Sequence, residues 1–466
     1  MILESFSVFA LAWAAGIGVA HVIWSSRDPW SILLKVFLGL GLGLGITSCL
    51  YFLRLVLIPG QGGYLLIQAV LLSTTITALY FKNRLSFVSF PRSISVTRNQ
   101  ILLSLAAGLV FAFALQYSLV AARVSPHGDY DAQAIWNLRA RFMYRLGDDW
   151  RNAFSPNINR DFHMDYPLLI PMNVVGGWNA LRDEVVRVPA VQSILFLLGL
   201  AGLLYAVLGY LRSASQAALG VIVALATPSL LQISTFQTAD IPLAYFFLAS
   251  SMLFLLARRE GSGDLLFLCG LMAGLSAWTK NEGLSFGLIM VIVTLAAFPQ
   301  SLKRSMLFRL AGGMALPLLT LLVFKVLFPA TNDLLADINL LSIARKLFDT
   351  TRYGTILTYL KSELAILGGW PFSILILLAA YGIVMGRSNS RRSQIGPWLF
   401  VIVGAQFLAY LLVYLATPND LVWQIRYSLS RLLIHLFPMG VLLFFLSVRA
   451  PENIDLASFP ASGNQP

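Results

Sequence analysis

Two aspartates stand two residues apart at Asp129 and Asp131, where a segment begins in which apolar residues recur at helical spacing over 135–146. Asp131 could cap that helix, because a short acidic side chain accepts hydrogen bonds from free backbone N–H groups. It could instead act as a general base that removes a proton from a polar acceptor. The two carboxylates could also hold a divalent cation through oxygen ligands. The spacing leaves these three roles open.

A second polar cluster consists of His163, Asp165 and Tyr166, directly before Pro167 and Pro171. Proline disfavours a regular helix, so we expect a shaped loop here that dips toward an apolar environment. Polar side chains beside such a dip suit a ligand that is part lipid and part polar. A structural hydrogen bond is the alternative role for His163.

Cationic side chains stand at the ends of later apolar stretches. Lys280 lies with Asn281 and Glu282 between two of them, where it could meet a phosphate as a point charge. A Lys280–Glu282 ion pair, or a lysine that reaches toward the aqueous boundary, is the alternative. Arg426 and Arg431 bracket the start of the last apolar stretch, and a planar guanidinium can bind two phosphate oxygens.

Other polar residues in apolar surroundings suit structural roles. Asp240 stands at an expected helix start, where capping explains it about as well as function does. His435, one turn deeper than Arg431, is expected to be a core histidine. Cys49 and Cys269 are interpreted as buried small residues, because neither their spacing nor their context suggests a disulfide or a metal site.

The elements that must position these residues are strongly apolar. Of 466 residues, 58% are hydrophobic and 12% are charged, whereas a soluble domain carries about 25% charged residues. The apolar residues gather in stretches that can cross a hydrocarbon layer of about 30 Å as helices. Lipid offers no partners to backbone groups, so each stretch should be helical. We therefore predict an all-α polytopic membrane protein with about thirteen transmembrane helices.

The expected spans are 5–24, 33–57, 64–81, 101–121, 186–210, 216–236, 240–257, 264–279, 284–298, 309–328, 364–385, 397–416 and 431–448. We divide the chain into an N-terminal three-helix addition (1–98), a transmembrane core (99–450, with a long outer loop over 122–187) and a disordered tail (451–466).

The charge distribution predicts the orientation. If the N-terminus lies outside and the spans alternate, the inner segments hold fifteen basic and five acidic residues. Basic residues in short loops stay on the cytoplasmic side, so the N-terminus is expected outside and the C-terminus in the cytoplasm. The net charge of +12 therefore reflects topology in a lipid bilayer and not a nucleic-acid partner. The N-terminal stretch contains Glu4 and lacks a basic start, so we expect a retained helix and not a cleaved signal peptide.

The longest polar segments fall on the outer side of this arrangement, over 123–187, 329–363 and 417–430. Long connections are usually functional or disordered, and the first is too rich in aromatic and apolar residues for disorder. We therefore expect chemistry or binding at the outer face.

Three segments resemble recurring motifs of the C-type (GT-C) membrane glycosyltransferases: YDAQAIWNLRAR from Tyr130, HMDYPLLIP from His163 and AWTKNEGL from Ala277. These enzymes include the protein O-mannosyltransferases and the aminoarabinose transferase that acts on lipid A. The chain is most similar to a bacterial glycosyltransferase-39-like branch, over roughly residues 100–450. The resemblance implies an enzyme of the bacterial plasma (inner) membrane that moves a hexose or pentose from a polyprenyl-phosphate sugar to a hydroxyl of a glycan, lipid or protein acceptor.

The resemblance also implies roles for single residues. Asp131 matches the catalytic acidic position of the family, and Asp165 is a second catalytic candidate in the second polar cluster. Lys280 and either Arg426 or Arg431 match basic positions near the lipid phosphate. The remaining expected substrate-binding residues are Asp129, His163, Tyr166 and Glu282.

Several features leave the chemistry partly open. The mannosyltransferases usually carry Asp-Glu at the first motif, whereas Ala132 follows Asp131 here, so the metal requirement is unknown. No nucleotide motif is present, and the glycines of GLGLGLG at 39–45 should permit close helix packing inside a span. Two other functions remain: a polymerase or ligase of lipid-linked glycans with another fold, and a non-enzymatic transporter of lipid or solute.

Overall fold

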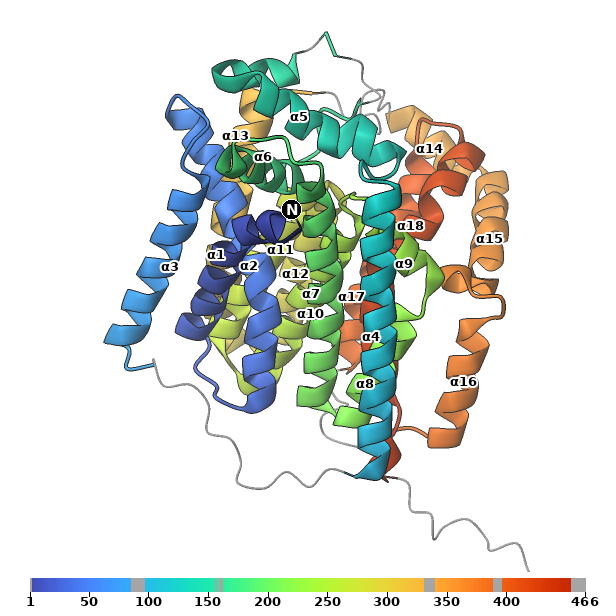
Figure 1. Ribbon diagram of the computed structural model, residues 1–466. Helices are drawn as coiled ribbons and strands as arrows, with labels where there is room; N and C mark the ends of the chain where they lie inside the picture. The colour runs from blue at the N-terminus through green and yellow to red at the C-terminus, as the bar shows by residue number, and fades with distance from the viewer. Residues whose placement is uncertain are drawn as a thin grey trace, which may run out of the picture.

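The computed structural model describes residues 2–84, 97–155, 157–158, 162–330, 340–388 and 396–453. The described residues form a helical bundle without a β-strand, as predicted (Figure 1). Its helices before the first long loop are α1 (Ile2–Ile23), α2 (Pro29–Leu57), α3 (Tyr64–Phe81) and α4 (Arg98–Val124). The loop region contains η1 (Ala132–Trp136), α5 (Asn137–Arg145), η2 (Gly147–Phe154) and α6 (Leu169–Leu181). The later helices are α7 (Arg187–Leu211), α8 (Ala214–Leu225), α9 (Pro228–Ser234), α10 (Asp240–Glu260), α11 (Gly263–Thr279), α12 (Glu282–Ala297), α13 (Gln300–Leu327), α14 (Leu340–Phe348), α15 (Thr350–Ala365), α16 (Ile374–Met385), α17 (Gly396–Ala416) and α18 (Leu421–Ser447).

The membrane-spanning character of the bundle follows from its long apolar helices. Among the described residues, nine helices are long and apolar enough to cross a membrane, and two bent pairs could raise that number to eleven. The pairs are α8 with α9, bent by 70°, and the helices of 350–369 with α16, bent by 75°. Helices α11 and α12 are apolar but shorter. The chain is a multi-pass membrane protein, and the count of thirteen spans stays a prediction.

Helix α2 packs closely on two sides because of its alternate glycines. Gly39 and Gly43 face α1, and a Cβ added to Gly43 would lie 1.8 Å from the carbonyl oxygen of Ala12. On the other side, the N–H of Gly41 donates a hydrogen bond to the hydroxyl of Tyr245 on α10 at 3.0 Å. Small residues let transmembrane backbones approach in this way, so the packing role predicted for GLGLGLG is confirmed.

The first three helices are packed into the rest of the bundle. The indole N–H of Trp278 on α11 donates to the Ser48 hydroxyl of α2 at 2.9 Å. The Tyr64 hydroxyl of α3 donates to the side-chain oxygen of Asn173 on α6, also at 2.9 Å. The division at residue 98 stays a prediction, and both the adjoining residues 85–96 and the tail residues 454–466 lie outside the described residues.

A layer formed by η1, α5 and η2 covers one end of the bundle (Figure 1). It is anchored by Glu184, whose two carboxylate oxygens accept hydrogen bonds from Arg141 Nε at 2.6 Å and Arg145 Nε at 2.7 Å. Burial acts to raise the pKa of Glu184, but the hydrogen bonds from Arg145 and Arg141 outweigh it and hold that pKa below its usual value.

The prediction of an irregular chain around both prolines is wrong for the second one. Pro167 lies in a loop, but α6 begins at Leu169 and contains Pro171 in its first turn. A first-turn proline is tolerated because its missing N–H would have had no partner within the helix. The chain therefore enters the bundle as a helix that is buried over 169–178.

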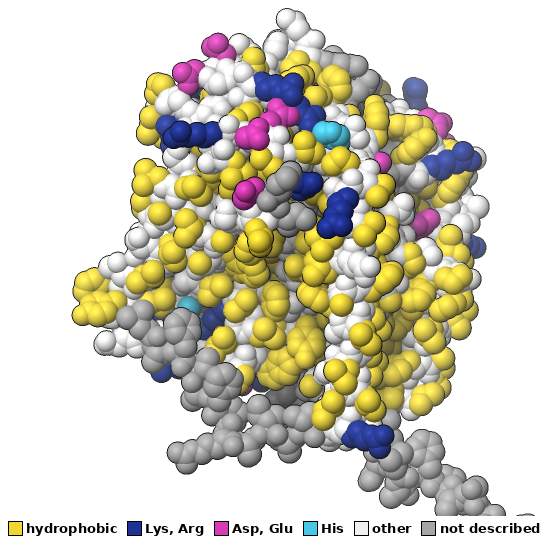
Figure 2. All heavy atoms as spheres, in the orientation of Figure 1, with side chains coloured by type: hydrophobic (Ala, Val, Ile, Leu, Met, Phe, Trp, Pro, Cys, Tyr) yellow, Lys and Arg dark blue, Asp and Glu magenta, His cyan; other side chains and the backbone are white. Residues whose placement is uncertain are grey.

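Figure 2 shows hydrophobic side chains over much of the middle of the visible face and charged side chains gathered near the end that α5 and η2 cover. The opposite end carries basic residues such as Arg258 and Arg259, in the last turn of α10. Which end faces the cytoplasm stays a prediction. Cys49 and Cys269 are buried free thiols, as predicted.

The close packing of α1 against α2 predicts that Gly43→Ala lowers stability. Alanine normally favours a helix over glycine, but its Cβ would collide with the Ala12 carbonyl, and forced overpacking costs about 1–3 kcal/mol. Thermal unfolding in detergent should show a lower midpoint for Gly43→Ala. The matched control is Gly108→Ala in α4, where no atom lies within 4 Å of the added Cβ. Equal midpoints for the two variants would contradict the packing argument.

Candidate active site

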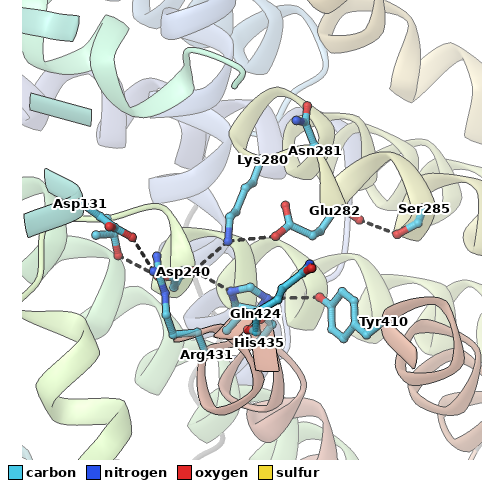
Figure 3. Close-up of polar contacts among 12 residues, drawn as sticks. Asp131, Asp240, Lys280, Asn281, Glu282, Ser285, Tyr410, Gln424, Arg431 and His435 are labelled. Atoms are coloured by element: carbon cyan, nitrogen blue, oxygen red, sulfur yellow. Dashed lines mark hydrogen bonds and ion pairs between the residues drawn. The ribbon is translucent and has the colours of Figure 1, made fainter. Parts of the chain in front are cut away.

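The carboxylate of Asp240 lies at the first turn of α10 and is completely buried. It accepts hydrogen bonds from the Thr238 hydroxyl at 2.9 Å, from Lys280 Nζ at 3.1 Å and from His435 Nε2 at 2.8 Å. Arg431 adds two more contacts, through Nε at 2.9 Å and Nη2 at 2.8 Å (Figure 3). A buried carboxylate is stable only when it is paired and hydrogen-bonded, and this one is both.

Lys280 reaches Asp240 from the turn between α11 and α12. It is the C-cap residue of α11, and its Nζ also lies 2.9 Å from the Glu282 carboxylate at the start of α12. The Lys280–Glu282 pair considered from the sequence is therefore present, but the lysine is shared with a second, buried carboxylate. About a quarter of the Glu282 side chain (24%) is exposed, whereas Lys280 is nearly covered.

Arg431, inside α18, joins the buried carboxylate to an accessible one. Its Nε and Nη2 contact the same oxygen of Asp240, and its Nη1 donates to the carboxylate of Asp131 (Figure 3). The side chains of Arg431 and Asp131 are each 27% exposed. We call Asp131, Asp240, Lys280, Glu282 and Arg431 the charged cluster, and its accessible edge is formed by Asp131, Glu282 and Arg431.

His435 closes the inner side of the charged cluster. It is completely buried, as expected of a core histidine, but its Nε2 faces Asp240 and its Nδ1 lies 3.2 Å from the Tyr410 hydroxyl. Because a carboxylate only accepts, Nε2 must donate to Asp240, and a neutral ring then accepts from Tyr410 through Nδ1. The histidine thereby fixes the position of the buried carboxylate.

The geometry at Asp131 does not fit the capping role. Asp131 precedes the π-helical η1, and its side chain makes no capping hydrogen bond, but it contacts Arg431. Asp129 is exposed, and its backbone N–H donates to the carbonyl of Phe236 at 3.2 Å. No group of three acidic, histidine or cysteine side chains among the described residues could hold a metal ion. The cation at Asp129 and Asp131 stays a prediction, and we derive no step from it because Arg431 already occupies the Asp131 carboxylate.

A buried glutamine holds the Asp131 segment against the start of α10. Gln237 donates to the carbonyl of Pro126 at 3.0 Å and accepts from the Asn137 side chain at 2.8 Å. Its backbone adopts φ +59°, which L-residues rarely do and which structure elsewhere must hold in place. These contacts set Asp131 opposite Arg431.

Asp165 belongs to a second network, which meets the first at the turn 280–282. It is buried and accepts from the side-chain amide of Asn281 at 2.6 Å, while Lys325 donates to its backbone carbonyl. Lys325 also contacts the Asn281 side-chain oxygen at 3.4 Å. Because Asn281 directly follows Lys280, the hydrogen bond to Asp165 links the second network to the charged cluster at this turn.

His163 and Tyr166 form an aromatic stack beside the second network. Tyr166 is stacked between Trp136, at a centroid distance of 5.5 Å, and His163, at 4.7 Å. The buried guanidinium of Arg139 donates to the backbone carbonyls of both residues, at 2.9 Å for Tyr166 and 2.7 Å for His163. Burial lowers the pKa of Arg139 to about 10, so it stays charged at neutral pH, and it pins this loop.

Of the predicted site residues, the structure brings together Asp131, Lys280, Glu282 and Arg431, and it places Asp165, His163 and Tyr166 in the neighbouring network. Arg426 is exposed outside the charged cluster, where its Nε lies 3.2 Å from the Tyr359 hydroxyl. Asp240 and Asn281 were not predicted as site residues. Asp240 could have been found by its position, since alternating spans put the start of 240–257 at the same end as Lys280.

The central position of Asp240 predicts that Asp240→Asn destabilises the fold. Removing one partner from a buried ionic network leaves the others uncompensated, at a cost on the order of 3–5 kcal/mol. Thermal unfolding in detergent should show a clearly lower midpoint. Asp148→Asn, an exposed aspartate of η2, makes the same chemical change and should leave the midpoint unaltered. An Asp240→Asn midpoint equal to that of wild type would contradict the anchoring role.

One family model matches part of this chain. The model of the family described as dolichyl-phosphate-mannose-protein mannosyltransferase matches residues 177–324. The matched range includes Asp240, Lys280 and Glu282, but neither Asp131 nor Arg431. The searches of curated proteins and of solved structures gave no match. The family match indicates a membrane glycosyltransferase of the GT-C superfamily that uses a lipid-linked sugar.

Proposed function

We propose that this chain transfers a sugar from a polyprenyl-phosphate donor to an acceptor hydroxyl at the accessible edge of the charged cluster. The observation that carries the proposal is the meeting of the Asp131 carboxylate and the Arg431 guanidinium at that edge, with Asp240 buried behind them. We place the reaction at the outer face of a bacterial plasma membrane and the enzyme in the glycosyltransferase-39-like branch. The acceptor is a glycan, a lipid or a protein.

Arg431 and Lys280 are the proposed phosphate partners. The planar fork of arginine matches two phosphate oxygens, and the lysine ammonium supplies a point charge beside it. Both are fixed by Asp240, so they need no reorganisation when negative charge develops on the leaving phosphate. The apolar surface of the bundle offers lipid-facing positions for the polyprenyl chain.

Asp131 is the proposed base. In a single displacement, the acceptor oxygen forms a bond to the anomeric carbon while the bond from that carbon to the phosphate oxygen breaks. Asp131 takes the acceptor proton, and the bonding electrons leave with the polyprenyl phosphate. The resemblance to the GT-C enzymes supports inversion at the anomeric carbon.

Asp165 is proposed to position the turn 280–282 through Asn281, because its carboxylate is buried against that side chain. His163 and Tyr166 shape the loop beside the turn, and the accessible part of Glu282 is the nearest candidate for contact with the sugar or acceptor.

If Asp131 is the base, Asp131→Asn should lower sugar transfer by about 10²–10⁴-fold, because an amide cannot accept the acceptor proton. The assay follows release of polyprenyl phosphate from a polyprenyl-phospho-sugar pool by protein in lipid nanodiscs, with membrane extract as the source of acceptor. Asp148→Asn is the matched control and should release polyprenyl phosphate at the wild-type rate. Equal release by wild type and Asp131→Asn would remove Asp131 from the chemistry. No release by wild type from a competent pool would favour a transporter.

The same assay separates the two arginines of α18. Arg431→Lys keeps the charge but loses the two-oxygen fork and one contact to Asp240. We therefore expect the rate of polyprenyl phosphate release to fall by about ten- to a hundredfold. Arg426 lies five residues earlier and outside the charged cluster, so Arg426→Lys should lower the release rate much less. A larger loss for Arg426→Lys than for Arg431→Lys would move the phosphate site toward Tyr359.

A further inference from the structure

The guanidinium of Arg431 has two edges that can each hold an anion, and both are taken by carboxylates. Nε and Nη2 point to one oxygen of Asp240, at 2.9 and 2.8 Å. Nη1 donates to Asp131 on the accessible side (Figure 3). A phosphate that binds to Arg431 with two oxygens must therefore displace one of these carboxylates.

The inner edge is not available for such an exchange. Asp240 is completely buried and also holds Lys280, His435 and Thr238. Its release would leave a buried charge, take the acceptor from His435 and Thr238, and leave Lys280 with Glu282 as its one carboxylate partner. Asp131 has an exposed fraction of 27% and can turn toward water. The phosphate can therefore replace only Asp131.

The charge of the cluster works against the incoming phosphate. Three carboxylates, of Asp131, Asp240 and Glu282, face the two cations Lys280 and Arg431. Arrival of a phosphodiester anion adds a further negative charge. Displacement of Asp131 moves one carboxylate away from the guanidinium and limits this repulsion.

We propose that Asp131 occupies the phosphate position on Arg431 in the free protein, and that the phosphate of a polyprenyl-phosphate lipid displaces it. The inference rests on the proposed function. It adds that Asp131 competes with the donor before it serves as the base. The carboxylate oxygen that Arg431 occupies in the free protein is released only when donor is present, and it can then take the acceptor proton. Donor should therefore bind before the acceptor is activated.

A direct consequence is that Asp131→Asn binds the lipid phosphate more tightly than wild type does, although it transfers sugar far more slowly. The probe is farnesyl phosphate, and its dissociation constant is measured by calorimetry with full-length protein in nanodiscs. Loss of the competing carboxylate should lower that constant by about tenfold, since a charge-assisted hydrogen bond no longer has to be broken. Asp148→Asn removes the same net charge from an exposed site at the same end of the bundle and should leave the constant unchanged.

The controls identify the ligand chemistry. Farnesol, which lacks the phosphate, should bind equally to wild type and Asp131→Asn. Inorganic phosphate tests whether the anion alone suffices. If Asp131→Asn lowers the dissociation constant of inorganic phosphate by as large a factor as that of farnesyl phosphate, the position binds free phosphate. That result would overturn the lipid part of the proposal. Thermal unfolding of every variant shows whether Asp131→Asn is folded. Asp131→Ala, measured in the same way, is a second variant that removes the competing carboxylate.

The outcomes separate this proposal from the proposed function. Tighter farnesyl phosphate binding with lost transfer supports both. Unchanged binding with lost transfer overturns the competition but keeps Asp131 as base, and unchanged binding with normal transfer overturns both. Weaker binding in Asp131→Asn, or no binding by either protein, would show that the phosphate position lies elsewhere.

Discussion

The buried carboxylate of Asp240 is the constraint on which the rest of the site depends. A charge removed from water at the start of α10 must be matched, and the matching groups come from the ends of α11 and from α18. Helix α18 is thereby fixed at one point to α10 and α11, although it is distant from both in sequence. The outer edge of Arg431 and the carboxylate of Asp131 remain accessible. The pairing that the buried Asp240 charge requires therefore also holds Arg431 in place as a preorganised anion position.

Much of the fold could be predicted from the sequence, because the apolar stretches are long and lipid leaves the backbone no alternative to helix. The first long polar loop lies at one end of the bundle, where η1, α5 and η2 form a layer. The details depend on tertiary contacts. Pro171 fits inside α6 because it lies in the first turn, and α8 and α9 form a bent pair where one span was expected. Pro228 at the start of α9 is a local signal for the break, but it does not give the size of the bend.

The site was predictable where residue type alone suggests chemistry. Asp131, Lys280 and Arg431 were singled out as charges at the ends of apolar stretches, and they meet in the structure. Asp240 was noted at an expected helix start, but capping and function were left equal, because an acid that caps a helix and one that anchors a cluster look alike in sequence. Arg426 and Arg431 were both candidates for the phosphate site, and which of them faces the bundle is decided by the packing of α18. Partners such as Asp131 and Arg431 are 300 residues apart, and no local pattern links them.

The central claim is that the groups anchored by Asp240 form the phosphate site. An electron cryo-microscopy structure of the protein in nanodiscs with a bound polyprenyl phosphate would test it most directly. The account predicts phosphate density within hydrogen-bonding distance of Arg431 and Lys280, with the contacts of Asp240 retained and the Asp131 carboxylate turned away from Arg431. Phosphate density elsewhere, for example beside Arg426 and Tyr359, with the Asp131–Arg431 pair intact, would contradict it.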